Sequence, residues 1–150
     1  MTIQNDRTSP AGPMRSTELD RSEALRLLGS VALGRIVFTR HALPQVRAVP
    51  HVLDGGDIVI RTHEGAALTR YTGLPGDPGV VVAYEADAID TGTHAGWSVV
   101  VTGYASLITD PRRLARYRAM IRPWQGRTMD DAVRIRPDLV TGVLLTAADT

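Results

Sequence analysis

The side chains best equipped for chemistry gather between Gln45 and Gly65 of this 150-residue chain. Guanidinium and imidazole groups donate hydrogen bonds and carry or can carry positive charge, and a threonine hydroxyl adds a further donor. Together they have the groups needed to hold an anionic, planar ligand. These residues are Arg47, His51, Arg61, Thr62 and His63.

The same stretch predicts a β-hairpin that carries these donors toward one end of a sheet. Val46, Ala48 and Val52 alternate with polar residues, and Ile58-Val59-Ile60 is again typical of a strand. Between them, Asp54-Gly55-Gly56-Asp57 has the residues that favour a tight turn.

Absent residue types exclude several kinds of chemistry. The chain has no cysteine, which removes disulfides, thiolate nucleophiles and cysteine-ligated metals. All 17 basic residues are arginine, so lysine Schiff bases and a Walker-type phosphate loop are excluded. A net charge of +1 gives no nucleic-acid footprint. No apolar run approaches the ~20 residues of a membrane span, and we expect a cytoplasmic protein.

Other catalytic constellations are weak. The four histidines His41, His51, His63 and His94 lie in separate segments without an H-x-x-x-H pair, so we expect no metal site. No G-x-S-x-G elbow is present. The acids that follow an apolar strand could act in acid–base chemistry or simply be solvated. They are Glu85, Asp87 and Asp90.

The remaining elements predict a mainly β (α+β) fold. We expect a flexible tail over residues 1–16 and one domain over 17–150. Short helices are expected at 20–29, where Asp20 caps and Gly29 stops the helix, and at 65–71. A third is expected at 111–120, where Asp110 caps the helix and Pro111 is its first residue. Because the order is not a regular βαβ alternation, we expect an antiparallel barrel of six or seven strands with peripheral helices. Strands beside the hairpin are expected at 31–38, 80–87, 97–105, 133–136 and 141–145.

The chain from about Leu19 to Leu145 resembles the pyridoxamine 5′-phosphate oxidase-like family of FMN-binding split barrels, especially its short actinobacterial flavin/deazaflavin oxidoreductase-like members. The order and spacing of several segments carry the resemblance. They are Gly34–Val37, Leu43–Val52, Arg61–Gly65, Val81–Asp87, Gly96–Gly103 and Arg122–Trp124.

This resemblance implies a homodimer with FMN, or the deazaflavin F420, in a groove between protomers. It places the second strand under the isoalloxazine ring, the end of the third strand and the following helix at the phosphate, and two further segments at the groove's edge. The implied cofactor-binding residues are Arg47, Ala48, Val49, Pro50, His51, Arg61, Thr62, His63, Gly65, Ala67, Leu68, Trp97, Ser98, Arg122 and Trp124.

One departure from the family pattern matters. Many relatives carry a Gly-x-Lys-Leu segment where this chain has Gly65-Ala66-Ala67-Leu68. Ala67 cannot replace a phosphate-binding cation, so flavin affinity depends on compensation by Arg61 or Arg70. Alternatives remain for single residues: Arg47 could pair with a carboxylate, and Trp97 could belong to the core.

The resemblance therefore implies a small FMN-dependent oxidoreductase that transfers hydride or electrons to or from a small molecule. The alternative is a noncatalytic binder of flavin, F420 or haem that uses the same dimer groove. No nucleic acid or membrane partner is expected.

Overall fold

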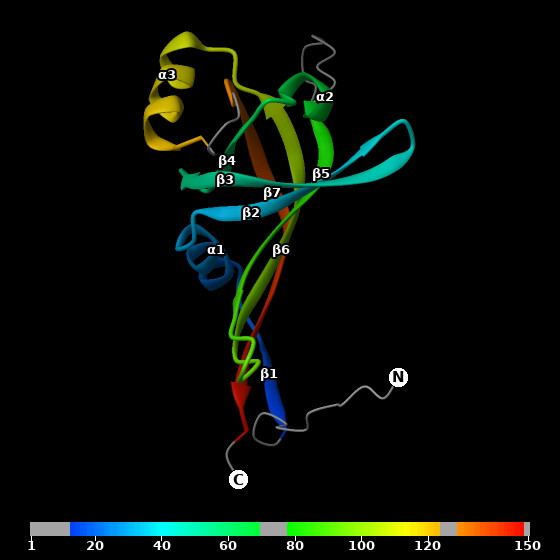
Figure 1. The fold of residues 1–150 in the computed structure, drawn as a ribbon, viewed down its shortest axis with the longest axis vertical. Coiled ribbons are helices and arrows are strands. Elements are labelled where there is room, and N and C mark those ends of the chain that lie inside the picture. The colour runs from blue at the N-terminus through cyan, green and yellow to red at the C-terminus, as the bar shows by residue number, and fades with distance from the viewer. Residues whose placement is uncertain (1–12, 70–77, 124–128, 149–150) are drawn as a thin grey trace, which may run out of the picture.

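The computed structural model describes residues 13–69, 78–123 and 129–148, and within these ranges the chain is mainly β (Figure 1). The helices expected near 20–29 and 111–120 are present, and so is the one that begins at Gly65. In chain order the elements are β1 (Met14–Glu18), α1 (Arg21–Gly29), β2 (Leu33–Arg40), β3 (Leu43–Asp54), β4 (Asp57–Thr62), α2 (Gly65–Thr69), β5 (Val80–Ile89), β6 (Gly96–Leu107), α3 (Pro111–Met120) and β7 (Asp131–Ala147).

Six of the strands close into a barrel. The sheet order is β1-β7-β4-β3-β2-β5-β6, and β7 also pairs with β6, so the ring closes from β6 back to β7. β1 is added as an extra strand along the C-terminal part of β7. All seven strand pairings are antiparallel, and closure of the ring leaves fewer strand edges unpaired. The expected six- to seven-stranded antiparallel split barrel with peripheral helices is confirmed.

The hairpin expected from Gln45 to Gly65 forms β3 and β4. Gly55 and Gly56 take positive φ angles of 61° and 86° in its turn, which is why glycine suits both positions. β3 and β4 pair only from His51 to Asp54 and from Asp57 to Ile60. Beyond these residues β3 continues along β2, whereas β4 continues along β7. The two strands therefore diverge, and this divergence is the split in the barrel.

β7 is one long strand, so the expectation of two strands at 133–136 and 141–145 is wrong. Pro137 does not end the strand, because it lies opposite Gly103 where the register between β6 and β7 shifts, and a bulge tolerates a residue without an N–H group. A Cβ atom on Gly103 would collide with the carbonyl of Arg136. β7 also pairs Met14 with Ala147, so residues 14–16 belong to a strand and not to the expected tail.

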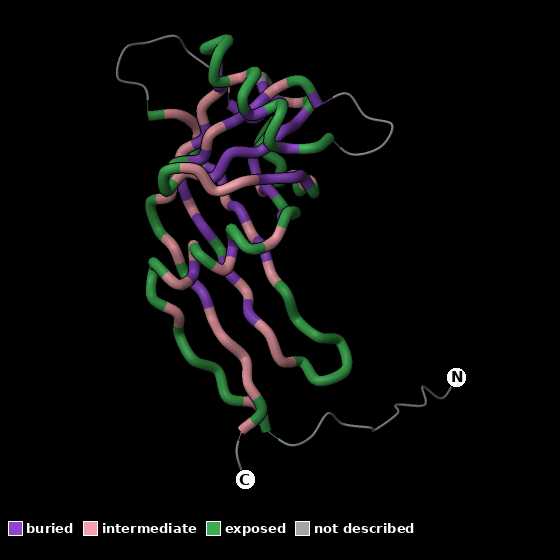
Figure 2. The backbone as a smooth tube through the Cα atoms, turned by 90° about the vertical axis from the view of Figure 1, so that its left-hand side faces the viewer, coloured by how far each residue is buried: buried purple, intermediate pink, exposed green. Residues whose placement is uncertain are grey.

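The core fills the barrel and extends under α1. Figure 2 shows the buried residues gathered toward one end of the molecule, with exposed and half-buried strand ends at the other. Tyr84 is fully buried in this core, and a Cβ atom on Gly34 would overlap its ring, so glycine there permits the close approach of the ring. Trp97 is also a core residue, with 8% of its surface exposed.

α1 and α3 begin with the caps expected from the sequence. The Asp20 carboxylate accepts the Glu23 N–H at 2.8 Å, and the Asp110 carboxylate accepts the Arg113 N–H at 3.3 Å. Gly29 is the last residue of α1, not the residue after it, because Ser30 supplies the C-cap. No helix in the described parts of the chain is long and apolar enough to cross a membrane.

Candidate functional site

The strands β3 and β4 enclose a hollow where they diverge, which we call the wedge. Its volume is about 260 Å³. The edge of β3 that faces it has no strand partner among the described residues between Leu43 and Pro50, so peptide groups of that edge remain available. The wedge is lined by Val46, Arg47, Ala48, Val49, Thr62, His63 and Met129. Five of the residues expected to bind a cofactor therefore meet at one place.

Arg47 is the cationic group of the wedge. Its guanidinium lies 5.7 Å from the centre of the Phe38 ring, within cation–π range. Nη1 donates to the carbonyl of Val46 at 2.9 Å, and Nη2 donates to the side chain of Gln45 at 3.3 Å. Nε points to a Glu64 oxygen at 3.4 Å. The carboxylate pairing considered for Arg47 is therefore present, and it occurs in the wall of the hollow.

Glu64 is the second residue after the end of β4 and contacts both Arg47 and His63 of this wall. Its Oε1 is 3.4 Å from Arg47 Nε and 3.3 Å from Nε2 of His63. Its Oε2 is buried and has no hydrogen-bond partner in the described part of the chain. A buried carboxylate oxygen without a donor is uncommon and costly. The wall therefore contains an acid whose charge is only partly compensated.

Arg61 does not reach the wedge, although it was expected at the cofactor phosphate. The side chain is buried, and Nε donates to the carbonyl of Met129 at 2.8 Å. Nη1 donates to the carbonyls of Arg118 at 3.2 Å and Ile121 at 2.8 Å, at the C-terminal end of α3. A cation is favoured at this end of a helix. Arg61 therefore joins α3 and the segment before β7 to the barrel and is not free for a phosphate.

His51 is also a core residue. It is 3% exposed, and its Nε2 lies 2.9 Å from the carbonyl of Leu28, while Nδ1 meets the Tyr84 hydroxyl. Burial lowers the pKa of His51, with hydrogen bonds to the carbonyls of Leu28 and Val31 opposing that shift. Its position two residues past Val49 of the wedge, together with these bonds, means that it supports β3 from inside.

The other expected site residues fall into separate places. Pro50 is buried beside His51, and Leu68 and Trp97 are core residues. The Gly65 N–H donates to the Asp131 carboxylate at 3.2 Å, and a Cβ atom there would come within 2.7 Å of the Asp131 side chain. Arg122 is exposed after α3 and does not line the wedge. Trp124, Arg70 and the side chain of Ala67 lie outside the described residues.

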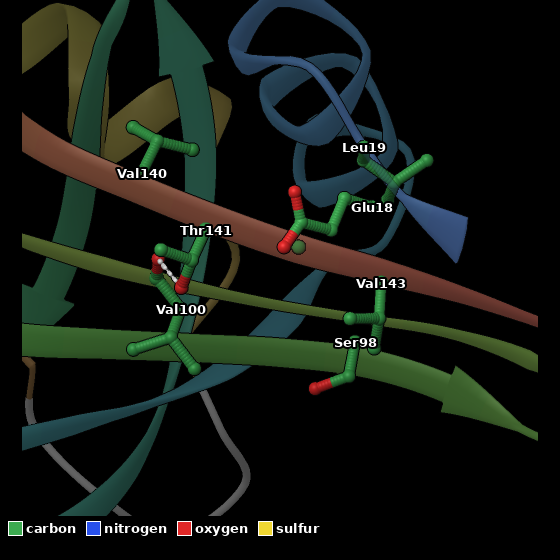
Figure 3. Close-up of a pocket in the computed structure, with 8 residues that line it drawn as sticks. Glu18, Leu19, Ser98, Val100, Val140, Thr141 and Val143 are labelled. Carbon is green, nitrogen blue, oxygen red and sulfur yellow. Dashed lines mark hydrogen bonds between the residues drawn. The ribbon is translucent and has the colours of Figure 1, made fainter. Parts of the chain in front are cut away.

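Ser98 lines a second hollow, of about 350 Å³, on the outer face of β6 and β7 (Figure 3). Figure 3 shows Val140, Thr141 and Val100 on one side of the hollow and Glu18, Leu19, Ser98 and Val143 on the other, where β1 joins β7. The Thr141 hydroxyl donates to the carbonyl of Val100 at 3.4 Å. Within one protomer, Ser98 is therefore not brought to the wedge.

An uncharged row of outward-facing side chains crosses five strands of the barrel next to the wedge. The strand registers pair Val46 with Val37, Val37 with Ala83, Ala83 with Thr102, and Thr102 with Leu139. Val46 is also a wedge residue, and Leu139 is 59% exposed. Val37, Ala83 and Thr102 between them are half-buried. Exposed apolar residues that form a contiguous patch can mark an interaction face. We call this set the apolar row.

The acids considered for acid–base chemistry have structural partners. Glu85 accepts from Arg35 at 3.0 Å, and Asp87 lies 3.6 Å from the same guanidinium. Burial, followed by the neighbouring Asp87, raises the pKa of Glu85, and Arg35 opposes that shift. Asp90 accepts the N–H groups of Gly92 and Thr93 in the turn before β6. None of the three carboxylates lines the wedge, but Asp87 and the wedge residue Ala48 both line a neighbouring hollow of about 420 Å³.

Sequence reasoning missed three residues of the site. Val46 was identified as a strand residue but not as a wall, although it adjoins Arg47. Glu64 lies between His63 and Gly65, both expected in the site, and this position in the sequence could have indicated it. Met129 reaches the wedge from a distant segment, and nothing local in the sequence indicates it.

Comparisons with known proteins agree with this fold. The family model described as pyridoxamine 5′-phosphate oxidase matches residues 20–144. The uncharacterized protein Rv0080 of Mycobacterium tuberculosis is 47% identical over 147 residues, which cover 98% of this chain and 97% of the relative. A candidate pyridoxamine 5′-phosphate oxidase of Corynebacterium glutamicum is 32% identical with a TM-score of 0.71, covering 89% of this chain and all of that one. The FAD-binding protein of Mycobacterium smegmatis is 29% identical with a TM-score of 0.59, covering 86% and 97%.

Proposed function

We propose that this chain, which belongs to the pyridoxamine 5′-phosphate oxidase family, binds a flavin in the wedge. The observation that carries the proposal is the hollow at the split of the barrel, where an unpaired strand edge adjoins the guanidinium of Arg47. A planar ring with polar edges needs an apolar wall and a few well-placed donors. Val46 and Ala48 provide the wall, and Arg47 provides donors. A solved relative of 29% identity binds FAD, which supports the same ligand class here.

The complete site belongs to a homodimer in this proposal. The wedge of about 260 Å³ falls below the ~300–1,000 Å³ of most cofactor pockets, so one protomer offers only part of a site. The apolar row begins at Val46 in the wedge and runs to Leu139, and a second copy that covers the row also reaches the wedge. A two-fold dimer buries the same surface on both copies. Ser98 and Arg122 lie outside the wedge of their own protomer and are candidates for the partner's wall.

The activity we propose is that of an oxidoreductase that acts on a small molecule. A bound FMN supplies hydride or electron transfer, and the deazaflavin F420 is the alternative cofactor. The chain's own residues bind and orient the ring and keep water from it. Arg47 is the described residue best placed to stabilise negative charge on the ring.

A noncatalytic binder of flavin, F420 or haem is the second candidate function. This candidate is favoured because two polar residues that were expected at the cofactor make their hydrogen bonds within the protein. His51 is bonded to Leu28 and Tyr84, and Arg61 is bonded to backbone carbonyls near α3. Neither is free to act on a substrate.

Ligand titration tests the proposal. The visible spectrum of the purified protein is recorded first, and the melting temperature is then measured with saturating FMN, FAD, F420 and haem. A ligand that binds the native state raises the melting temperature by mass action, so a rise with a flavin or F420 is expected. If none of these four ligands raises the melting temperature, the proposal is overturned.

Turnover separates the two candidate functions. A bound flavin that is bleached by a nicotinamide donor and reoxidised by an added acceptor identifies an oxidoreductase. A flavin that binds tightly yet is never reduced in the protein identifies a binder.

A further inference from the structure

Glu64 connects the two wedge-lining side chains that can carry positive charge. One of its oxygens, Oε1, lies 3.4 Å from Nε of Arg47 and 3.3 Å from Nε2 of His63. Both partners line the wedge, whereas Glu64 stands behind them with 17% of its side chain exposed. Its carboxylate therefore contacts both Arg47 and His63 without itself forming the surface that meets a ligand.

The negative charge of Glu64 is not fully balanced by these contacts. Charge-assisted hydrogen bonds to carboxylates are typically ~2.7–2.9 Å long, and both contacts to Oε1 are longer. The second oxygen, Oε2, is buried and has no partner among the described residues. Arg47 also divides its donors between Val46 and Gln45. An under-compensated carboxylate thus lies directly behind the wall of the wedge.

Among the described residues, the neighbourhood gives this charge little further relief. Arg61 is close in sequence, but its guanidinium is directed to the carbonyls of Met129 and Ile121. The Gly65 N–H, a donor that could otherwise meet an anion, is taken by the Asp131 carboxylate. An additional dianionic group near the wedge would therefore be repelled by Glu64 and would compete with it for Arg47 and His63.

We propose that Glu64 is a positioning residue that sets the charge preference of the wedge: it favours the uncharged ring and ribityl part of a flavin and gives no advantage to a phosphate group. This inference rests on the proposed flavin binding and deepens it. The terminal phosphate of FMN adds little affinity over riboflavin while Glu64 is present, since the carboxylate repels the phosphate and competes with it for Arg47 and His63.

The test compares the dissociation constants of riboflavin and FMN for the wild-type protein and three variants. Glu64→Gln keeps the shape and removes the charge, and Glu64→Asp keeps the charge. Glu23→Gln is the matched control, because it makes the same change in net charge on α1, where Glu23 pairs with the exposed Arg26. Melting temperatures without ligand establish that each variant is folded.

For the wild-type protein we expect the two dissociation constants to agree within about threefold. Glu64→Gln should tighten FMN about tenfold while riboflavin changes by less than about threefold, and the gain should diminish as salt is added. Glu64→Asp and Glu23→Gln should keep the wild-type ratio. A ratio that Glu64→Gln leaves unchanged, or equal weakening of both ligands, would overturn the inference and leave flavin binding standing. If neither flavin binds to any variant, the proposed function falls and the inference falls with it.

Discussion

The Tyr84 hydroxyl on β5 donates a hydrogen bond to Nδ1 of His51 on β3, at 2.5 Å. Nε2 faces the carbonyl of Leu28 at 2.9 Å, and a carbonyl can only accept, so Nε2 carries a proton. Because burial lowers the pKa of His51 and so favours the neutral imidazole, Nδ1 is then the acceptor for the Tyr84 hydroxyl. Through this ring, β5 and β3 are joined to the end of α1, directly behind the strand that forms the wedge.

Replacing Tyr84 with phenylalanine should destabilise the fold without changing the ligand site. The variant leaves Nδ1 of His51 buried without a donor, which costs about 1–3 kcal/mol in the free energy of unfolding. Urea denaturation measures the change. Tyr104→Phe is the matched control, because Tyr104 is only half-buried on the outer face of β6. A Tyr84→Phe protein as stable as the control would contradict the role assigned to this bond.

The pH dependence of stability should report the buried imidazole. Burial lowers the pKa of His51 in the folded protein, so the unfolded chain binds a proton more readily. The contribution of the neutral His51 to the free energy of unfolding is fully present above pH 6.5, the ordinary pKa of histidine. It is lost as the pH falls from 6.5 toward the lowered pKa of His51 in the folded state. The slope reaches at most about 1.4 kcal/mol per pH unit. Unfolding measured across this window should show a His51→Gln protein with a flatter profile than the wild type.

Arg61→Ala should affect stability much more than flavin affinity. It removes the donors to the carbonyls of Met129, Arg118 and Ile121, at a cost of about 3 kcal/mol. Arg112→Ala, an exposed arginine of α3, is the control. Thermal unfolding and flavin titration below the melting temperature distinguish the two properties. If the Arg61→Ala protein is folded but no longer binds flavin, Arg61 contributes to the phosphate site after all.

Filling the wedge should abolish ligand binding and leave the fold intact. Ala48 is an exposed wedge residue, and Ala48→Trp places an indole in a hollow of about 260 Å³. We expect at least about a hundredfold loss of flavin affinity, about 3 kcal/mol. Ala119→Trp, on the exposed side of α3, should bind as the wild type does. Equal affinities of the two variants would locate the ligand elsewhere.

A charge in the apolar row should separate the proposed dimer. Leu139→Arg buries an unpaired guanidinium if a second copy covers the row, whereas Met120→Arg changes an exposed apolar residue of α3. Light scattering coupled to size exclusion should give half the wild-type mass for Leu139→Arg and the wild-type mass for Met120→Arg. Flavin affinity should fall together with the mass. An unchanged mass for Leu139→Arg would exclude this face as the interface.

Local sequence patterns predicted most of the fold because their causes are local. Alternating residues, the double-glycine turn and the Asp20 and Asp110 caps each act within a few residues. The continuity of β7 could not be found in this way, because the bulge that accommodates Pro137 depends on Gly103 in β6, more than thirty residues earlier. A proline in the middle of a strand pattern argues for a break until its partner strand is known.

The site was predicted as a region more successfully than as a set of side chains. The resemblance located the stretch from Arg47 to His63, and the wedge lies there. The resemblance could not say which donors the fold itself uses. His51 bonds to the carbonyl of Leu28, and Arg61 bonds to the carbonyl of Ile121 after α3, and both partners are distant in sequence. At the end of a strand that enters the core, an inward polar side chain makes its hydrogen bonds within the protein. Only side chains that point outward, or backbone groups on a strand edge, are then available to a ligand.

β7 pairs with β1, β4 and β6, so the order in which the chain is synthesised matters for how the barrel forms. Until residues 131–147 leave the ribosome, β4 and β6 each have an open edge, and β1 has no strand to join. Such edges are templates for pairing with other chains. β7, made after the other described strands, is thus the strand that closes the ring, and in that step the open edges of β4 and β6 both gain a partner.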